Sequence, residues 1–331
     1  MRRLVLSAGS LLLAAGLIAV MPRLVGADWT AIVAGLGALS PGVLALLVVL
    51  WLAGLGMYTF VLTGSLPGLR HGQAFQLNAA GSAVSNLLPF GGAAGVAATF
   101  AMAGSWGFSA PSVTVSTLVS GVWNVFGRLL LPALGIVALL SIGEVPNREL
   151  GAAAASAGVV LAACAVLLAV ALRFESAARW VHDRLHSLAA RSPHRLATLL
   201  RGLGTALLRI RAETIDVLRT GWKTLTFGMT GYLFLQGVLF WACLWAVGSP
   251  PRLAETVAAF ALNRVLTSVV LTPGGTGVTE TGTAAALVHF GLDATPAATA
   301  VLLYSFFTYV IEIPLGALAW THWLWHRHQK P

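Results

Sequence analysis

Residues 253–291 read LAETVAAFALNRVLTSVVLTPGGTGVTETGTAAALVHFG, and this stretch decides the fold. It is apolar enough to enter a bilayer, but residues 273–275 (PGG) interrupt it midway. Proline removes a backbone donor and glycine leaves a helix easily, so the stretch predicts two half-helices joined by a loop. A second apolar stretch, residues 74–107, is interrupted in the same way at residues 89–92 (PFGG). Such breaks are tolerated within a membrane only when they are buried in protein or face a wet cavity.

The composition around these stretches is that of a membrane protein. Of the 331 residues, 57% are hydrophobic and 9% are charged, and the mean hydropathy is +0.84. Soluble domains carry roughly 25% charged residues, which excludes that class. The apolar runs are continuous, unlike the alternating strands of a transmembrane barrel. Hydropathy predicts about six full spans, at residues 4–20, 42–63, 112–140, 151–174, 226–248 and 297–325.

The basic residues predict the orientation in the membrane. The net charge is +9, and in a membrane protein this excess indicates topology, not nucleic-acid binding. Fifteen Lys and Arg residues lie on one side of the predicted spans and three on the other. Retained basic residues mark cytoplasmic loops, so we expect a multi-pass protein of the bacterial inner membrane with both termini cytoplasmic. Residues 25–27 loosely resemble a signal-peptide cleavage site, although the long apolar run before them favours a retained anchor.

Residues 174–222 form the one long polar stretch between predicted spans. Its leucines recur at helical spacing, and ten basic residues lie within 173–223. We expect a basic amphipathic helix that lies along the anionic cytoplasmic leaflet. A solvated loop that only sets the topology is an equally open reading of the same residues.

The two interrupted stretches predict an internal repeat. Residues 87–96 (LLPFGGAAGV) align with residues 270–278 (VLTPGGTGV) with a one-residue gap. The repeat units would be residues 42–141 and 224–326, within a single membrane domain 1–331. The span at 151–174 would reverse the second unit. The expected fold is therefore an all-α polytopic membrane protein, with about six full spans and two broken re-entrant hairpins in an inverted-topology repeat. Many transporters are built on this plan, although shared composition could mimic part of the alignment.

Four ionisable residues fall inside predicted membrane segments: Arg128, Arg264, Glu280 and Glu312. A charge facing lipid at a helix centre costs at least about 2.5 kcal/mol, so all four should face the protein interior. We expect the two cations to pair with the two carboxylates, and Arg128 to meet Glu312 across the axis of the repeat. The alternatives are a purely structural ion pair and, for Glu280, a carboxylate that stabilises the dipole of its own helix.

These charges and their neighbours define a candidate lipid head-group site. The N-termini of the half-helices would present backbone N–H groups to an anion, and Tyr304, Thr308 and Glu312 would share one face of the last span. The smaller polar residues could instead serve only to hold helices together. The predicted site residues are Asn86, Gly91, Gly92, Asn124, Arg128, Asn263, Arg264, Gly274, Gly275, Thr276, Gly277, Glu280, Tyr304, Thr308 and Glu312.

Two segments that contain predicted site residues resemble the signature of a known family. Residues 273–280 (PGGTGVTE), followed by residues 302–309 (LLYSFFTY), resemble the signature of the lysylphosphatidylglycerol synthase transmembrane, or flippase-like, family. Thr279 and Ser305 stand where that family usually has Arg, which weakens any inference about head-group selectivity. The resemblance covers nearly the whole chain and includes no aminoacyl-transferase domain. It therefore implies lipid translocation and not lipid aminoacylation.

Motifs for energy coupling or enzymatic chemistry are absent from the sequence. It contains no nucleotide-binding P-loop, no HExxH motif and no nucleophile elbow, and we expect no metal or cofactor. The sequence favours a transporter over an enzyme, moving an anionic phospholipid or a polyprenyl-phosphate-linked lipid between leaflets. The alternative is a membrane scaffold or enzyme subunit that presents a lipid acceptor to a separate transferase. Such a transferase or a second copy of the chain would then be its protein partner.

Overall fold

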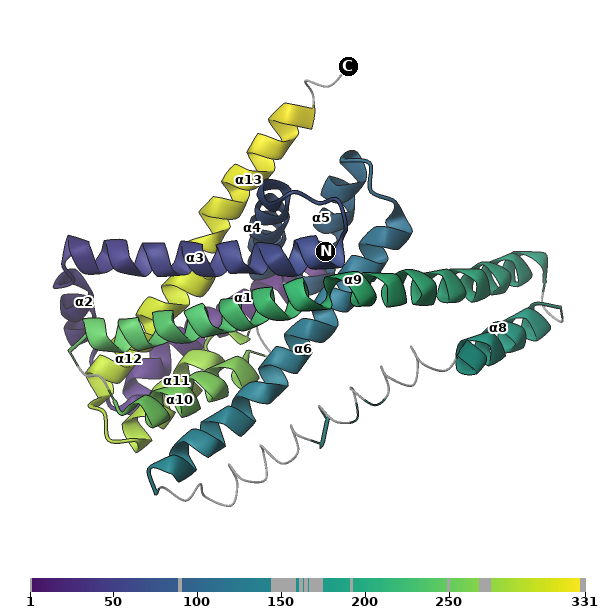
Figure 1. Cartoon of the computed structure of the whole chain (residues 1–331). Coiled ribbons are helices and arrows are strands. Elements are labelled where there is room, and N and C mark those ends of the chain that lie inside the picture. The colour runs from purple at the N-terminus through teal and green to yellow at the C-terminus, as the bar shows by residue number, and fades with distance from the viewer. Residues whose placement is uncertain are drawn as a thin grey trace.

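The computed structural model describes residues 2–88, 91–143, 175–190, 193–248, 251–267 and 275–327, and a few positions between 159 and 166. The described residues are helical apart from short connections (Figure 1). The helices are α1 (Arg2–Val25), α2 (Trp29–Gly37), α3 (Pro41–Ser65), α4 (His71–Leu87), α5 (Gly91–Ser105), α6 (Ala110–Ser141), α8 (Glu175–Ala190), α9 (His194–Ala246), α10 (Leu253–Leu266), α11 (Val278–His289), α12 (Ala294–Ser305) and α13 (Glu312–Arg327). A π-helical turn, η2 (Phe306–Val310), joins the last two.

The all-helical membrane fold is confirmed for the described residues. Four of the helical segments there are long and apolar enough to cross a bilayer, and the number is five if the bent pair α1 and α2 forms one span. The four are residues 41–65, 110–141, 196–246 and 294–327. The predicted span at 151–174 falls almost entirely outside the described residues. The coarser expectation, several apolar helices in one multi-pass chain, is what the structure supports.

Both interrupted stretches consist of short helices. The first gives α4 and α5, and the second gives α10 and α11, each with 12 to 17 residues. About 20 residues are needed to cross a hydrocarbon core, so none of the four spans it alone. Within each pair the two helices pack against one another. The Pro89-Phe90 break and residues 268–274 lie outside the described residues.

Local sequence explains where several helices begin. Ser40 and Ser109 precede α3 and α6, and each hydroxyl accepts a hydrogen bond from the backbone N–H three residues later at 3.3 Å. Side chains at this position satisfy amides that the helix itself leaves unpaired. Pro41 then stands in the first turn of α3, where its missing N–H costs nothing.

Helices α3 and α9 form the most extensive contact of the bundle, and glycines allow their close approach. A Cβ atom at Gly228 would lie 2.7 Å from the backbone nitrogen of Val61 and 2.8 Å from Cβ of Phe60. A Cβ atom at Gly64 of α3 would lie 3.2 Å from the backbone nitrogen of Leu225 in α9. Small residues at such contacts let membrane helices gain packing energy that the surrounding lipid cannot supply.

The expectation for residues 174–222 needs correction. This segment is not a loop with a separate interfacial helix: α8 packs back along the N-terminal half of α9, and α9 continues without a break into the apolar span (Figure 1). Its 53 residues correspond to a rod of about 80 Å, far longer than the bilayer core of about 30 Å. Hydropathy marked where the chain becomes apolar, which is not where the helix begins. Four leucines of the predicted apolar face stay exposed: Leu196, Leu199, Leu203 and Leu207.

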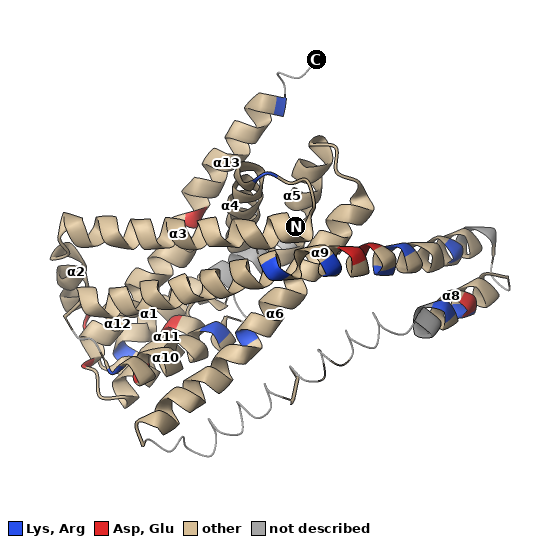
Figure 2. Ribbon diagram, in the orientation of Figure 1, with Lys and Arg blue, Asp and Glu red and all other residues tan. Residues whose placement is uncertain are grey.

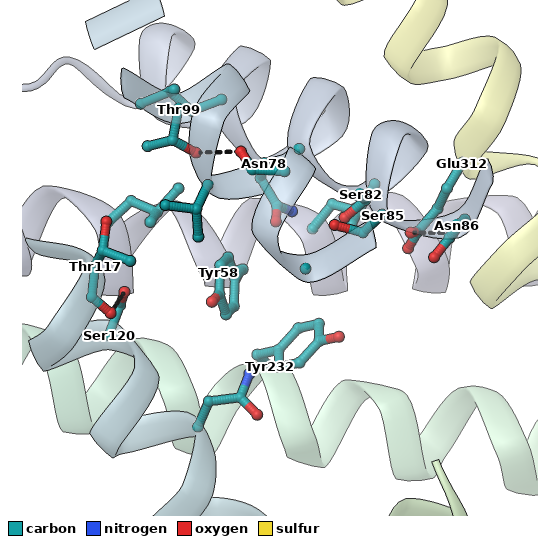
Figure 3. Close-up of a pocket in the computed structure, with 18 of the residues that line it drawn as sticks. Tyr58, Asn78, Ser82, Ser85, Asn86, Thr99, Thr117, Ser120, Tyr232 and Glu312 are labelled. Carbon is teal, nitrogen blue, oxygen red and sulfur yellow. Dashed lines mark hydrogen bonds between the residues drawn. The ribbon is translucent and has the colours of Figure 1, made fainter. Parts of the chain in front are cut away.

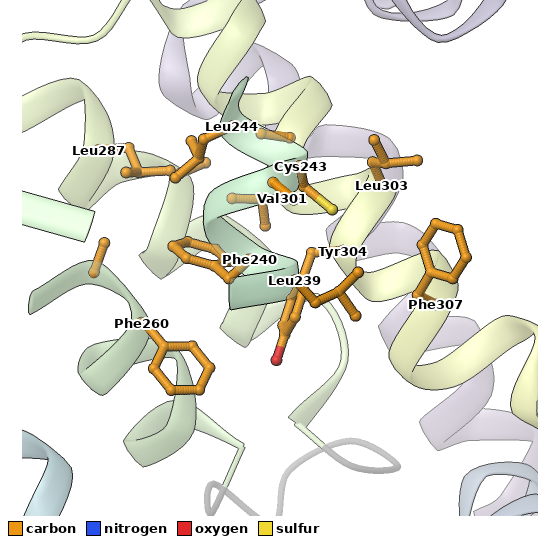
Figure 4. Packing of buried hydrophobic residues seen from close by; sticks show 14 of the residues in the cluster. Leu239, Phe240, Cys243, Leu244, Phe260, Leu287, Val301, Leu303, Tyr304 and Phe307 are labelled. Atoms are coloured by element: carbon orange, nitrogen blue, oxygen red, sulfur yellow. The ribbon is translucent and has the colours of Figure 1, made fainter. Parts of the chain in front are cut away.

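A core of buried apolar side chains lies between α9, α10, α11 and α12 (Figure 4). Phe240 and Tyr304 meet edge to face, with ring centroids 5.2 Å apart, and Phe260 packs beside both. This core fixes the ends of the helices that carry Arg264 and Thr308. It therefore positions one wall of the cavity described next.

Candidate functional site

A polar cavity of about 420 Å³ lies between α3, α4, α5, α6, α9, α10 and the last span. Figure 3 shows hydroxyl, amide and carboxylate groups around it, with Tyr58 and Tyr232 next to each other. The polar side chains that line it are Tyr58, Asn78, Ser82, Ser85, Asn86, Thr99, Ser116, Thr117, Ser120, Asn124, Arg128, Tyr232, Arg264, Thr267, Thr308, Tyr309 and Glu312. Polar groups at this density among apolar helices are typical of a site that binds a polar ligand.

Two arginines border this cavity. Arg128 of α6 donates a hydrogen bond from Nη1 to the hydroxyl of Thr267 at 3.2 Å. Arg264 of α10 is 7% exposed and donates from Nη2 to Oδ1 of Asn263 at 2.9 Å. The Arg264 guanidinium also lies over an aromatic ring, 5.5 Å from the centroid of Phe260. Both cations are thus held by neutral groups.

The predicted pairing of these cations with carboxylates is wrong. Among the described residues, the ion pairs within 4 Å are Arg209 with Glu213 and Arg252 with Glu255, and neither involves a cavity arginine. Arg128 and Glu312 line the same cavity, as the repeat predicted, but form no ion pair across it. A buried charge is costly unless a counter-charge or hydrogen bonds compensate it. The site therefore carries positive charge that a bound anion could neutralise.

Glu312 also lines the cavity, at the start of α13, and is 8% exposed. Asn86 at the end of α4 donates from Nδ2 to its carboxylate at 3.4 Å (Figure 3). The same amide nitrogen lies 3.4 Å from the backbone oxygen of Tyr309. Asn86 therefore links the first broken stretch to the last span at the edge of the cavity.

Glu280 has a structural role and does not line the cavity. It is fully buried at 0% exposure, and its carboxylate accepts hydrogen bonds from the backbone N–H of Gly277 and from the hydroxyl of Ser305, the latter at 2.7 Å. A carboxylate in the first turn satisfies free amides and complements the helix dipole. The alternative reading of Glu280, stabilisation of its own helix, is the one that the geometry supports.

The described part of the loop in the second broken stretch, residues 275–277, is not part of the cavity lining. Gly275 and Gly277 adopt φ angles of 76° and 90°, a region that favours glycine, and with Thr276 they connect to α11. None of the three lines the cavity, and the backbone N–H of Gly277 is already bound by the carboxylate of Glu280. Gly274 lies outside the described residues. At the first broken stretch, by contrast, Gly91 begins α5 and Gly92 lines the cavity.

The π-helical turn changes which residues of the last span face the cavity. Thr308 and Glu312 line it, but Tyr304 does not, so the three do not share one polar face. Tyr304 is 1% exposed, its hydroxyl donates to Oε1 of Gln236 at 2.9 Å, and its ring lies 5.6 Å from the Arg264 guanidinium. A π-turn adds residues to one turn of helix and rotates everything after it. Tyr309, which lies within this turn, lines the cavity.

Asn263 also stands behind the cavity. Its Oδ1 accepts from Arg264, while its Nδ2 donates to the hydroxyl of Thr283 on α11 at 3.2 Å. It therefore positions the Arg264 guanidinium and ties the two short helices together. Asn124, in contrast, lines the cavity one turn from Arg128, where the sequence predicted it.

Several cavity residues were not predicted as site residues. Ser116 and Ser120 are two of them: they precede the predicted Asn124 and Arg128 at intervals of four along α6, and this spacing is a signal in the sequence for one polar helix face. Tyr58 and Tyr232 carry no such signal, because each lies within an otherwise apolar span. For metal binding, the described residues bring together no group of three or more His, Cys, Asp or Glu side chains.

The fold and the cavity define the class: a multi-pass helical membrane protein with a cationic, polar site among its spans. The chain belongs to the family described as the lysylphosphatidylglycerol synthase TM region, whose model matches residues 7–316. The match covers the membrane region and confirms the predicted family. No curated protein matches the chain. Membership in this family points to a role that involves membrane lipids.

Proposed function

We propose that this protein is a lipid transporter of the flippase type, which moves a lipid with an anionic head group between the leaflets. The observation that carries the proposal is the placement of Arg128 and Arg264. Both border one cavity deep among apolar helices, and neither has a carboxylate partner among the described residues. Guanidinium groups bind phosphate with strong, directional hydrogen bonds. The candidate substrates are an anionic phospholipid and a polyprenyl-phosphate-linked lipid.

The proposed mechanism uses an inverted repeat of two broken hairpins. Local geometry supports the repeat, because α5 and α11 are both followed by a glycine at the same backbone angle. Gly107 has a φ of 91° and Gly291 a φ of 92°. In each unit the next helix, α6 or α12, then begins three residues later with a proline in its first turn. Repeat units of opposite orientation would let the cavity open to each side in turn.

The proposal includes an orientation. We propose that the protein lies in the bacterial cytoplasmic membrane with both termini and the hairpin of α8 and α9 on the cytoplasmic side. Lys and Arg gather on this hairpin and are sparse in the rest of the bundle (Figure 2). Their distribution supports the orientation through the preference of basic segments for the cytoplasmic face. The hairpin would meet the anionic lipid surface there.

The test is lipid movement in vesicles that contain the purified protein. Fluorescent phosphatidylglycerol in the inner leaflet is protected from dithionite until it crosses, so the rate of quenching reports translocation. We expect the wild-type protein to accelerate quenching, and Arg128→Gln and Arg264→Gln to slow it by at least about tenfold, the loss of one charged hydrogen bond. Arg209→Gln is the matched control, since Arg209 lies on the exposed hairpin and pairs with Glu213. Equal rates in all variants would refute the site.

The projecting hairpin supports a second candidate function. It carries exposed leucines, including Leu199 and Leu203, beside its basic residues, and such a surface suits a partner protein. In this reading the membrane part presents a lipid acceptor to a separate transferase. Replacing the hairpin arginines with Gln would then abolish product formation with the transferase and leave lipid movement in vesicles unchanged. Unchanged product formation in this variant would refute the docking role of the hairpin.

A further inference from the structure

A large apolar groove lies on the bundle between α6, α9 and α10. Its volume is about 820 Å³, and its lining is almost entirely hydrocarbon. The exposed lining residues include Leu130 and Leu134 of α6, Phe234 and Trp241 of α9, and Leu253 of α10. A volume of this size falls within the range that binds small molecules in proteins, about 300–1,000 Å³.

The groove and the cationic cavity are built from neighbouring residues of the same three helices. On α6, Gly127 lines the groove and Arg128 lines the cavity. On α10, Phe260 lines the groove, and its ring lies 5.5 Å from the guanidinium of Arg264, which lines the cavity. On α9, Tyr232 faces the cavity and the next residue faces the groove. The apolar groove and the cationic cavity are therefore adjacent along α6, α9 and α10.

We propose that this groove holds a hydrocarbon chain of the lipid whose head group occupies the cavity. The inference rests on the proposed function and adds a chain-binding site to it. A head group drawn to Arg128 and Arg264 remains attached to its chains, which need an apolar path beside the cavity. Among the described residues, the groove reaches Arg264 through the ring of Phe260 and includes Gly127, the chain neighbour of Arg128. An anionic amphiphile has the matching arrangement, with charge at one end and hydrocarbon at the other.

The groove should give the hydrocarbon chain a path beside the cavity and should add little to the binding free energy. Lipid tails are as apolar as leucine, so a chain gains little free energy by moving from bulk lipid into the groove. Charged hydrogen bonds to the head group supply the affinity instead. Filling the groove should therefore slow the movement of long-chain lipids and leave head-group binding, and the movement of short-chain lipids, nearly unchanged.

The first experiment locates the chain by photolabelling. Wild-type protein in phosphatidylcholine vesicles is mixed with phosphatidylglycerol that carries a diazirine on one acyl chain, irradiated, and digested. We expect labelled peptides that contain Leu130 and Leu134 or Phe234 and Trp241, with labelling reduced by excess unlabelled phosphatidylglycerol. Uniform labelling of lipid-facing positions, including Val137, would overturn the proposal. So would a crosslink between Leu134→Cys and a cysteine introduced within residues 151–174, because the chain itself would then cover the groove.

The second experiment fills the groove. Leu134→Trp and Val238→Trp place a large ring in it, and Val137→Trp is the matched control, since Val137 is 63% exposed on the same helix and does not line the groove. We expect the two groove variants to move long-chain phosphatidylglycerol at least fivefold more slowly than the control. All three variants should move a short-chain analogue at the wild-type rate. Unchanged long-chain movement in both groove variants would overturn the proposal.

The two experiments separate failure of the groove from failure of the proposed function. If the wild-type protein moves no lipid but the label still falls in the groove, the transport function fails and the chain site stands. If Arg128→Gln stops lipid movement while the groove variants and the labelling show no preference, the transport function stands and the chain site fails.

Discussion

Replacing Arg128 with Gln distinguishes a ligand site from a structural ion pair. When one partner of a buried ion pair is removed, the protein loses about 3–5 kcal/mol of stability, because the other charge remains buried without compensation. Arg128 has no such partner among the described residues. Its neighbour Thr267 keeps a hydrogen bond without it, since the Thr267 hydroxyl also donates to the backbone oxygen of Arg264 at 2.7 Å. The loss of stability should therefore be about 1 kcal/mol or less, the value of one hydrogen bond.

Ligand binding should respond much more strongly than stability. A hydrogen bond from a charged donor contributes about 1.5–3 kcal/mol, so Arg128→Gln should weaken binding of an anionic lipid by about tenfold to a hundredfold. Arg128→Lys keeps the charge but loses the planar guanidinium that binds phosphate through two parallel hydrogen bonds. Its lipid affinity should lie between those of the wild type and Arg128→Gln.

The assay is thermal unfolding in detergent, with and without added phosphatidylglycerol. We expect wild-type protein and Arg128→Gln to unfold at similar temperatures without lipid, and the stabilisation by lipid to be largely lost in the variant. A variant that unfolds far below the wild type in the absence of lipid would refute the reasoning. It would show that Arg128 neutralises a buried charge of the protein itself.

Four further changes test other parts of the structure. Glu280→Gln should lower stability by about 1.5–3 kcal/mol through its hydrogen bonds while leaving lipid affinity in the folded fraction unchanged, as measured by unfolding and binding. Gly228→Leu should prevent α3 and α9 from packing and lower the yield of folded protein in size-exclusion chromatography, whereas Gly121→Leu, at a position with nothing within 4 Å, should not. Hydrogen bonds from Thr30 and Ala31 lower the pKa of Asp28 below its ordinary 3.8. The Asp28 cap on α2 is therefore complete above pH 3.8 and is lost as the pH falls through the lower pKa of the folded state. Hydrogen exchange of the Thr30 and Ala31 amides should show this loss of protection in the wild type and not in Asp28→Asn. Glu312→Gln should raise affinity for an anionic lipid in the same binding assay, because it removes a negative charge from the cavity.

The helices and their interruptions could be predicted from the sequence because they depend on local chemistry. Proline and glycine together in one short run, as at residues 89–92 and 273–275, favour the end of a helix, whereas single residues such as Pro132 in α6 and Gly228 in α9 stay within one. The long helix α9 could not be predicted in the same way. Its polar N-terminal half and its apolar C-terminal half suggested two elements, yet no residue between Thr205 and Thr226 interrupts the helix. Polarity predicts whether a helix lies in water or in lipid better than it predicts where the helix begins and ends.

The site was only partly predictable, because contact between distant helices depends on rotation about each helix axis. Arg128, Arg264 and Glu312 were expected to face the interior, and they do line one cavity. Whether the arginines pair with carboxylates could not be predicted, because it depends on side-chain distances between different helices, which residue spacing does not give. Tyr304 shows the limit most clearly: a single π-helical turn just after it changes which residues of the last span share a face.

The charges of the cavity also bear on which head group it suits. Two guanidinium groups and one carboxylate, from Arg128, Arg264 and Glu312, leave a single positive charge when the carboxylate is ionised. A phosphodiester head group carries one negative charge and would balance it. A phosphate group with two charges would leave the buried site negative, and that excess would be costly where water is scarce. Glu312 lines the same cavity as the two arginines, so the charge of its carboxylate counts in this balance. A phospholipid and a polyprenyl lipid joined to its head group through a single phosphate are both phosphodiesters, and either fits the site better than a lipid with a diphosphate link or a terminal phosphate.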